Sequence, residues 1–235
     1  MEKINNSKKE QVNQNKNEQI DFPKEAIDLY SEQSLRESID SQIFHLITSN
    51  LNNSLNYLQY LNDQRSNLIT ISPFIYDQMS SLFLGILTNV NNKLSDKKEQ
   101  TDIQNKCYQL LDLILVLSQT FYKQTNENEK KGELLLSQIK IHTIWGCPKT
   151  WIQLIQFSFD NQFKKQQELL LNELKNKDKK TIQKVLKEKE KNIMKNTLLT
   201  FKYHFKEFNI QSLQNTILDS FIKKYNLYEI NKVNF

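Results

Sequence analysis

The sequence predicts an all-α protein, a single multi-helix domain of paired antiparallel helices. Three observations carry this prediction. The 235 residues include only three glycines and three prolines, whereas average usage is about 7% glycine and 5% proline. Sandwiches, barrels and doubly wound sheets need glycine at many tight turns. Apolar residues recur at three- and four-residue spacing along most of the chain, and no period-two run of strand length occurs.

The N-terminal part of the chain is predicted to consist of a polar tail followed by helices. Residues 1–20 are rich in Lys, Asn, Gln and Glu and are predicted to form a disordered polar tail. Residues 21–235 are predicted to form the helical domain. A helix is expected to begin at Asp21, with Pro23 in its first turn. A second apolar pattern runs from Leu35 to Leu51 and continues more loosely to Leu68.

The clearest helix start is Ser72 followed by Pro73, because serine caps and proline suits the first helical position. Gly85 lies inside the apolar stripe that follows, and we expect another helix to cross closely there. The next cap is expected at Thr101 and Asp102. The helix after it is apolar on most sides, which predicts that it forms the buried centre of the fold.

The second half of the chain contains further helices separated by polar stretches. Residues 123–131 are predicted to form a loop, and residues 134–145 a helix that is broken at Gly146–Pro148. Pro148 is expected to open the next helix. A lysine-rich stretch, residues 173–195, precedes two closing helices that hold apolar residues 198–208 and 213–225. This pattern favours a HEAT-like right-handed stack of helix pairs, as in translation-factor scaffolds, over a four-helix bundle.

Composition restricts the function classes. The chain is 38% hydrophobic and 25% charged, as is typical of a soluble globular protein. Its net charge is +5, and Arg36 and Arg65 are its only arginines, which disfavours sequence-specific nucleic-acid recognition. Residues 1–17 contain no apolar run of a secretory signal, and no stretch approaches the ~20 apolar residues of a membrane span. We therefore expect a cytoplasmic protein.

Catalytic, metal and cofactor sites have no positive support in the sequence. The three histidines, His45, His142 and His204, have no His or Cys at metal-ligand spacing, and the two cysteines, Cys107 and Cys147, are far apart. No glycine-rich phosphate loop, nucleophile elbow or paired catalytic carboxylates were found. We expect no enzymatic activity, no cofactor and no metal.

Two candidate sites remain. Residues 175–195 are rich in lysine and form a candidate polyanion contact for nucleic acid or anionic lipid. Solvated surface is the alternative, because acidic residues interrupt the stretch. The candidate contact residues are Lys177, Lys180, Lys184, Lys187 and Lys191. The second site is the corner formed by His142, Trp145 and Trp151, around Gly146 and Pro148. It either binds a partner or locks the core.

The central segment resembles a known helical module. A leucine-rich helix ends in Phe121 and Tyr122, and a further segment leads to His142, Trp145 and Trp151. This arrangement resembles the helical module of the set-binding-factor members of the myotubularin-related proteins, over about fifty residues. The resemblance implies an α-helical module without chemistry, in proteins linked to membrane traffic.

The first functional hypothesis is therefore a non-enzymatic scaffold that binds a protein partner in a groove between helix pairs. The alternatives are a lysine-mediated adaptor for nucleic acid or anionic membrane, and a structural subunit of a larger cytoskeletal or ribosomal assembly.

Overall fold

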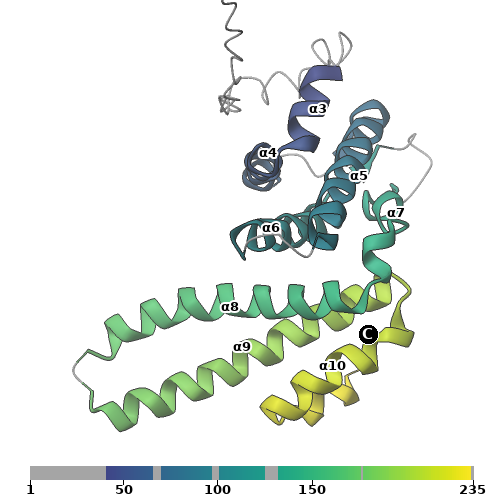
Figure 1. Ribbon diagram of the computed structural model, residues 1–235. Coiled ribbons are helices and arrows are strands. Elements are labelled where there is room, and N and C mark those ends of the chain that lie inside the picture. Colours follow the sequence, from purple (N-terminus) through teal and green to yellow (C-terminus); the bar gives the residue numbers. More distant parts are fainter. Residues whose placement is uncertain (1–40, 66–69, 97–100, 125–131, 176, 234–235) are drawn as a thin grey trace, which may run out of the picture.

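The computed structural model describes residues 41–65, 70–96, 101–124, 132–175 and 177–233, and within these ranges the fold is all-α (Figure 1). Two short strands, β1 (Thr70–Ile71) and β2 (Tyr122–Lys123), pair in parallel. The helices are α3 (Ser41–Ser49), α4 (Leu51–Gln64), α5 (Pro73–Ser95), α6 (Thr101–Ser118), α7 (Leu136–Ile139), α8 (Pro148–Glu173), α9 (Lys179–Glu207) and α10 (Gln211–Tyr225), with 3-10 helices η1 (Thr143–Gly146) and η2 (Tyr228–Lys232).

The helix starts follow from local side-chain chemistry. Asn50 separates α3 from α4, and its side chain accepts hydrogen bonds from the backbone of Asn52 and Asn53. Ser72 caps α5 by accepting from the backbone N–H of Ile75 at 3.4 Å, and Pro73 is the first residue of that helix. Pro148 opens α8 in the same position. The predicted starts at residues 72–73 and 148 are confirmed.

Gly85 lies where α3 crosses α5. A Cβ atom at this position would meet Thr48 Cγ2 at 2.7 Å and Phe44 Cζ at 3.4 Å. The first distance is shorter than real Cβ contacts allow, so the missing side chain permits the close approach. The expectation of a close helix crossing at Gly85 is confirmed.

Helix α6 is the central element of the fold. It packs against α4, α5, α7 and α8. Its buried side chains include Cys107, Leu111 and Ile114, each fully removed from solvent. The expectation of a buried central helix is confirmed.

The longest helices form an antiparallel pair. α8 and α9 pack along each other, and α10 covers part of both. The outer ends of α8 and α9 extend beyond α6 and α10 (Figure 1). We call residues 163–192 the arm; its described parts are 163–175 and 177–192. Asp178 caps α9 by accepting from the backbone N–H of Thr181 at 2.9 Å.

Two sequence expectations are wrong in this half. Residues 179–195 of the lysine-rich stretch and the first closing helix form one continuous helix, α9, because nothing between Asp178 and Phe208 interrupts the backbone hydrogen bonds. The helix predicted for residues 134–145 is only α7 followed by η1. His142 is extended there, with φ −67° and ψ 136°, and its Nδ1 accepts from the N–H of Ile144. This local hydrogen bond competes with helix continuation.

Several expectations lie outside the described residues. These are the polar tail 1–20, the helix start at Asp21, the part of the second apolar pattern before residue 41, and most of the predicted loop at 125–131. Lys123, placed in that loop from the sequence, is part of β2. The HEAT-like stack stays a prediction.

Candidate functional site

The tryptophan corner lies where η1 leads into α8. Trp145 is 2% exposed and Trp151 is fully buried. The indole Nε1 of Trp145 donates to the carbonyl oxygen of Ile139 at 3.1 Å, at the end of α7. The indole Nε1 of Trp151 donates to the carbonyl oxygen of Trp145 at 2.7 Å. The Ile139 carbonyl oxygen also accepts from the backbone N–H of His142 at 3.1 Å, so the Trp145 indole adds a second hydrogen bond there. Both indole N–H groups are thus paired inside the protein, as buried donors require.

Phenylalanines from the end of α9 complete this corner. Trp151 packs edge-on against Phe205 at 5.0 Å and Phe208 at 5.5 Å between ring centroids. Trp145 contacts Trp151 at 5.3 Å and Phe208 at 5.0 Å. Such pairs contribute about 0.5–1.5 kcal/mol each beyond the area they bury. The corner thus joins the start of α8 to the end of α9 and offers no indole surface to a partner.

His142 lies at the edge of this corner and is half-buried. Its Nε2 is 3.3 Å from Thr88 Oγ1 of α5, and its Nδ1 accepts from Ile144. Burial lowers the pKa of His142, so the ring is neutral at pH 7 and links α5 to η1.

The predicted lysine contacts all lie on the arm, at the opposite end of the α8–α9 pair from the tryptophans (Figure 1). Lys177 lies in the turn before α9. The other four follow one another on α9 in steps of four, three and four residues, which places them on one face of the helix. All five are exposed. They are Lys177, Lys180, Lys184, Lys187 and Lys191.

A groove of about 840 Å³ lies between α6 and α8 and was not predicted from the sequence. Tyr108 of α6 and Phe157 of α8 contribute rings 6.3 Å apart. One pair of charges comes from α6, Asp102 and Lys106, and the other from α8, Asp160 and Lys165. Six side-chain amides also line the groove: Gln104, Asn105, Gln109, Gln153, Gln156 and Asn161.

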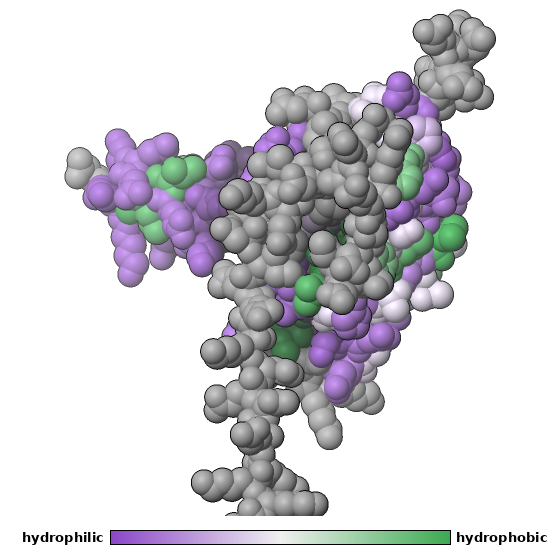
Figure 2. Space-filling model, turned by 90° about the horizontal axis from the view of Figure 1, so that it is seen from above, coloured by the Kyte–Doolittle hydropathy of each residue, from purple (hydrophilic) through white to green (hydrophobic). Residues whose placement is uncertain are grey.

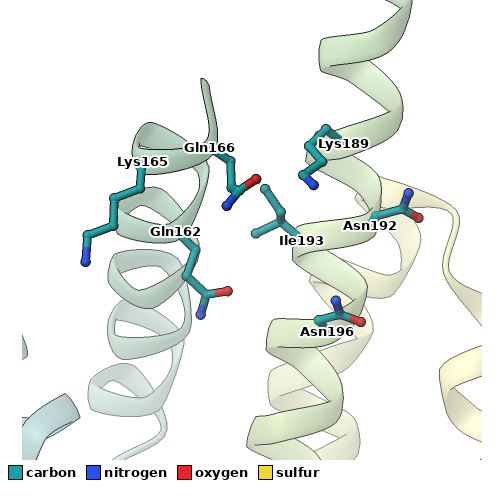
Figure 3. A pocket seen from close by; sticks show the side chains of 7 residues that line it. All are labelled: Gln162, Lys165, Gln166, Lys189, Asn192, Ile193 and Asn196. Carbon is teal, nitrogen blue, oxygen red and sulfur yellow. The ribbon is translucent and has the colours of Figure 1, made fainter. Parts of the chain in front are cut away.

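A smaller groove of about 310 Å³ lies between α8 and α9 at the base of the arm. Figure 3 shows its lining, in which Ile193 lies between the two helices and Lys189 extends toward Gln166. Its lining contains no carboxylate. The lining residues are Gln162, Lys165, Gln166, Lys189, Asn192, Ile193 and Asn196.

Two titratable groups, buried His204 and half-buried Asp112, lie in contacts between helices. Burial lowers the pKa of His204 to about 4, and Gln119 Nε2 lies 2.7 Å from its Nδ1. An amide nitrogen only donates, so Nδ1 is the acceptor and the ring is neutral. Burial raises the pKa of Asp112, while a hydrogen bond from Ser158 Oγ at 3.2 Å opposes that rise. Both groups lie in helix contacts and belong to the framework.

Within the described ranges, no group of three or more His, Cys, Asp or Glu side chains is placed to hold a metal ion. Over the same ranges, every helix is too short or too polar to cross a bilayer.

Sequence reasoning located the corner and the lysine row but missed both grooves. For the groove between α6 and α8, the only trace in the sequence is the presence of Gln and Asn residues on two separate helices. With 27 Asn and 22 Gln in the chain, an amide that lines a groove has no sequence signature that distinguishes it from one on open surface.

No protein family, curated protein or solved structure matches this chain.

Proposed function

We propose that this protein is a non-enzymatic α-helical interaction module that binds an extended polypeptide segment in the groove between α6 and α8. The observation that carries the proposal is the set of six side-chain amides that line this groove. An amide side chain offers both hydrogen-bond donors and an acceptor. A peptide backbone presents the same two groups, so such a lining can bind main chain whatever its side chains.

The charges and rings of the groove fit the same type of ligand. Two aspartates and two lysines in the lining cancel in formal charge, so the groove does not select a strongly charged partner. The rings of Tyr108 and Phe157 offer apolar contact beside the amides. The other lining residues are polar or charged, so hydrogen bonds rather than apolar burial would provide most of the contact.

The length of the groove limits the size of the ligand segment. Its lining on α6 runs from Thr101 to Gln109, which is about 12 Å at 1.5 Å per helical residue. An extended chain rises about 3.3 Å per residue, so the groove holds roughly four residues.

We place the module in the cytoplasm, a reducing compartment, because Cys107 and Cys147 are both free thiols.

Selection from a random peptide library, followed by titration of the selected peptides, tests this proposal. The groove variant is Gln104→Glu/Asn105→Asp/Gln153→Glu, which keeps the shape of three exposed amides but removes their donors. Each lost hydrogen bond is worth about 0.5–1.5 kcal/mol. The affinity should therefore fall by at least about tenfold.

The matched control carries the same type of change on exposed amides outside both grooves, Gln59→Glu/Gln211→Glu/Asn215→Asp. It should bind the peptides as the wild type does. Hydrogen exchange on the complex should show protection in α6 and α8. Failure to select any peptide, or equal loss of binding in both variants, would show that this groove is not a peptide site.

A further inference from the structure

The arm carries the whole net charge of the chain. Residues 163–192 contain 10 lysines and 5 acidic residues, a difference of +5. The full chain has 32 basic and 27 acidic residues, so 22 of each lie outside the arm and cancel. The excess positive charge is therefore concentrated on a projecting hairpin (Figure 1).

The same face of α9 carries a buried lysine near the end of the helix and exposed lysines on the arm. Lys202 lies eighteen residues after Lys184, which is five full turns, so both point in the same direction from the helix axis. Lys202 is buried, and its Nζ donates to the carbonyl oxygen of Ile230 in η2 at 2.8 Å. On the arm the same face is open, and its four lysines are exposed. They are Lys180, Lys184, Lys187 and Lys191.

The arm also exposes large apolar side chains. Leu169 is 57% exposed and Leu171 is 44% exposed. Both lie within five residues of the end of α8, or about 8 Å along the helix axis. Figure 2 shows apolar surface on the arm surrounded by hydrophilic surface. Leu169 and Leu171 are two residues apart in α8 and therefore point to different sides of the helix. Only a partner that the end of the arm enters would remove both from water.

Lysine together with exposed leucine fits a lipid surface better than a nucleic acid. Proteins that bind single-stranded nucleic acid stack bases on aromatic side chains, and those that read base edges or phosphates rely heavily on arginine. The arm contains no arginine, and its only aromatic residue, Phe163, is half-buried. Peripheral membrane segments instead combine lysine with apolar residues that reach about 5–10 Å into the interface.

We propose that the arm is a docking element for anionic lipid bilayers. The lysines attract the negatively charged headgroups, and Leu169 and Leu171 enter the boundary between headgroups and acyl chains. Lysines near the turn reach back to the headgroup layer through their long aliphatic stems. The groove at the base of the arm, with Lys165 and Lys189 and no carboxylate in its lining, adds positive charge on the side of α9 that faces α8. The arm and the α6–α8 groove share Lys165, but the four lysines and two leucines of the proposed membrane contact lie outside that groove.

Co-sedimentation of the full chain with vesicles tests this proposal. We expect binding to vesicles that contain phosphatidylserine, little binding to phosphatidylcholine alone, and a steep loss as salt increases. The lysine variant is Lys180→Gln/Lys184→Gln/Lys187→Gln/Lys191→Gln. A lysine near an anionic surface contributes about a fivefold increase in partitioning, so removal of four should weaken binding by about 100-fold or more.

The control variant removes the same charge from lysines outside the arm, Lys140→Gln/Lys149→Gln/Lys206→Gln/Lys232→Gln, and should weaken binding far less. A second variant, Leu169→Gln/Leu171→Gln, keeps every charge. It should reduce the binding that remains at high salt. Circular dichroism of each variant checks that the helices are intact.

Three results would overturn the proposal: no binding to phosphatidylserine vesicles at low salt, equal loss in the arm and control lysine variants, or unchanged binding in the leucine variant. A gel shift with single-stranded RNA forms a separate arm of the test. RNA binding that depends on the four lysines, in the absence of vesicle binding, would assign the arm to nucleic acid instead. The peptide-groove variant should bind vesicles normally, so failure of one proposal is distinguishable from failure of the other.

Discussion

Replacement of Gly85 by alanine tests the close crossing of α3 over α5. Alanine in a helix interior is favoured over glycine by about 1 kcal/mol, so the substitution would stabilise an open position. At Gly85 the new Cβ would lie 2.7 Å from Thr48 Cγ2. Thr48 has little freedom to move away, because its Oγ1 donates to the carbonyl oxygen of Phe44 at 2.8 Å.

The magnitude follows from these two opposing contributions. Overpacking of a well-packed site costs about 1–3 kcal/mol, which exceeds the gain in helix propensity. Gly85→Ala should therefore lower the free energy of unfolding by up to about 2 kcal/mol. Thr48→Ser removes only the Cγ2 methyl group and keeps the hydroxyl. In that background the contact at 2.7 Å is gone, and the tight contact with the Cβ of residue 48 at 3.2 Å remains. Gly85→Ala should then cost clearly less stability than in the wild type, or raise the free energy of unfolding by up to about 1 kcal/mol.

Urea unfolding followed by circular dichroism measures all four members of this double-mutant cycle. Gly146→Ala is the control, because nothing lies within 4 Å of a Cβ at that position. It should change the free energy of unfolding by no more than about 0.5 kcal/mol. An equal effect of Gly85→Ala in both backgrounds would refute the argument, since the effect would then not depend on the Thr48 methyl group.

Two further predictions follow from the buried side chains. Trp151→Ala should lower the free energy of unfolding by about 3–5 kcal/mol. Lys184→Ala, at an exposed position, should change it by less than about 0.5 kcal/mol. Strong quenching of the native tryptophan fluorescence by acrylamide would contradict the burial of both indoles. His204 has a pKa of about 4 in the fold and an ordinary value of 6.5, so the unfolded state binds the proton first as pH falls. Stability should then be full above about pH 6.5 and fall by about 3 kcal/mol toward pH 4, and His204→Gln should remove that slope. Asp112, whose pKa is raised, contributes a slope of opposite sign in the wild type and in His204→Gln alike. The contribution of His204 is therefore the difference between the two pH profiles. Identical profiles would show that His204 contributes nothing to the pH dependence.

The outcome at individual elements shows where sequence reasoning is reliable. Ser72 and Pro73 act through hydrogen bonds and a φ restriction within one turn, so their effect is the same in almost any fold. Residues 134–145 have apolar spacing suited to a helix, yet the chain there turns twice. Two local hydrogen bonds contribute, from the Ile144 N–H to His142 Nδ1 and from the Trp145 indole to the Ile139 carbonyl. The tertiary contribution is the packing of Trp145 against Phe208 at the end of α9.

The candidate sites differ in the same way. The lysine row could be predicted because its charges recur at helical spacing within one continuous segment, α9. Its position on a projecting arm could not be predicted, because that position depends on where α6 and α10 end beside α8 and α9 (Figure 1). The amide-lined groove combines side chains from α6 and α8, and their meeting depends on packing across about fifty residues of chain.

The sequence alone determined the helical class, several helix starts and the central position of α6. These features depend on backbone conformation, local hydrogen bonds and the periodicity of apolar side chains, all of which act within a few turns. Only the tertiary structure decided that the two tryptophans face inward, that the lysines project on a hairpin and that six amides share a groove. Those features depend on which helices become neighbours, and that choice is made by the burial of the whole core.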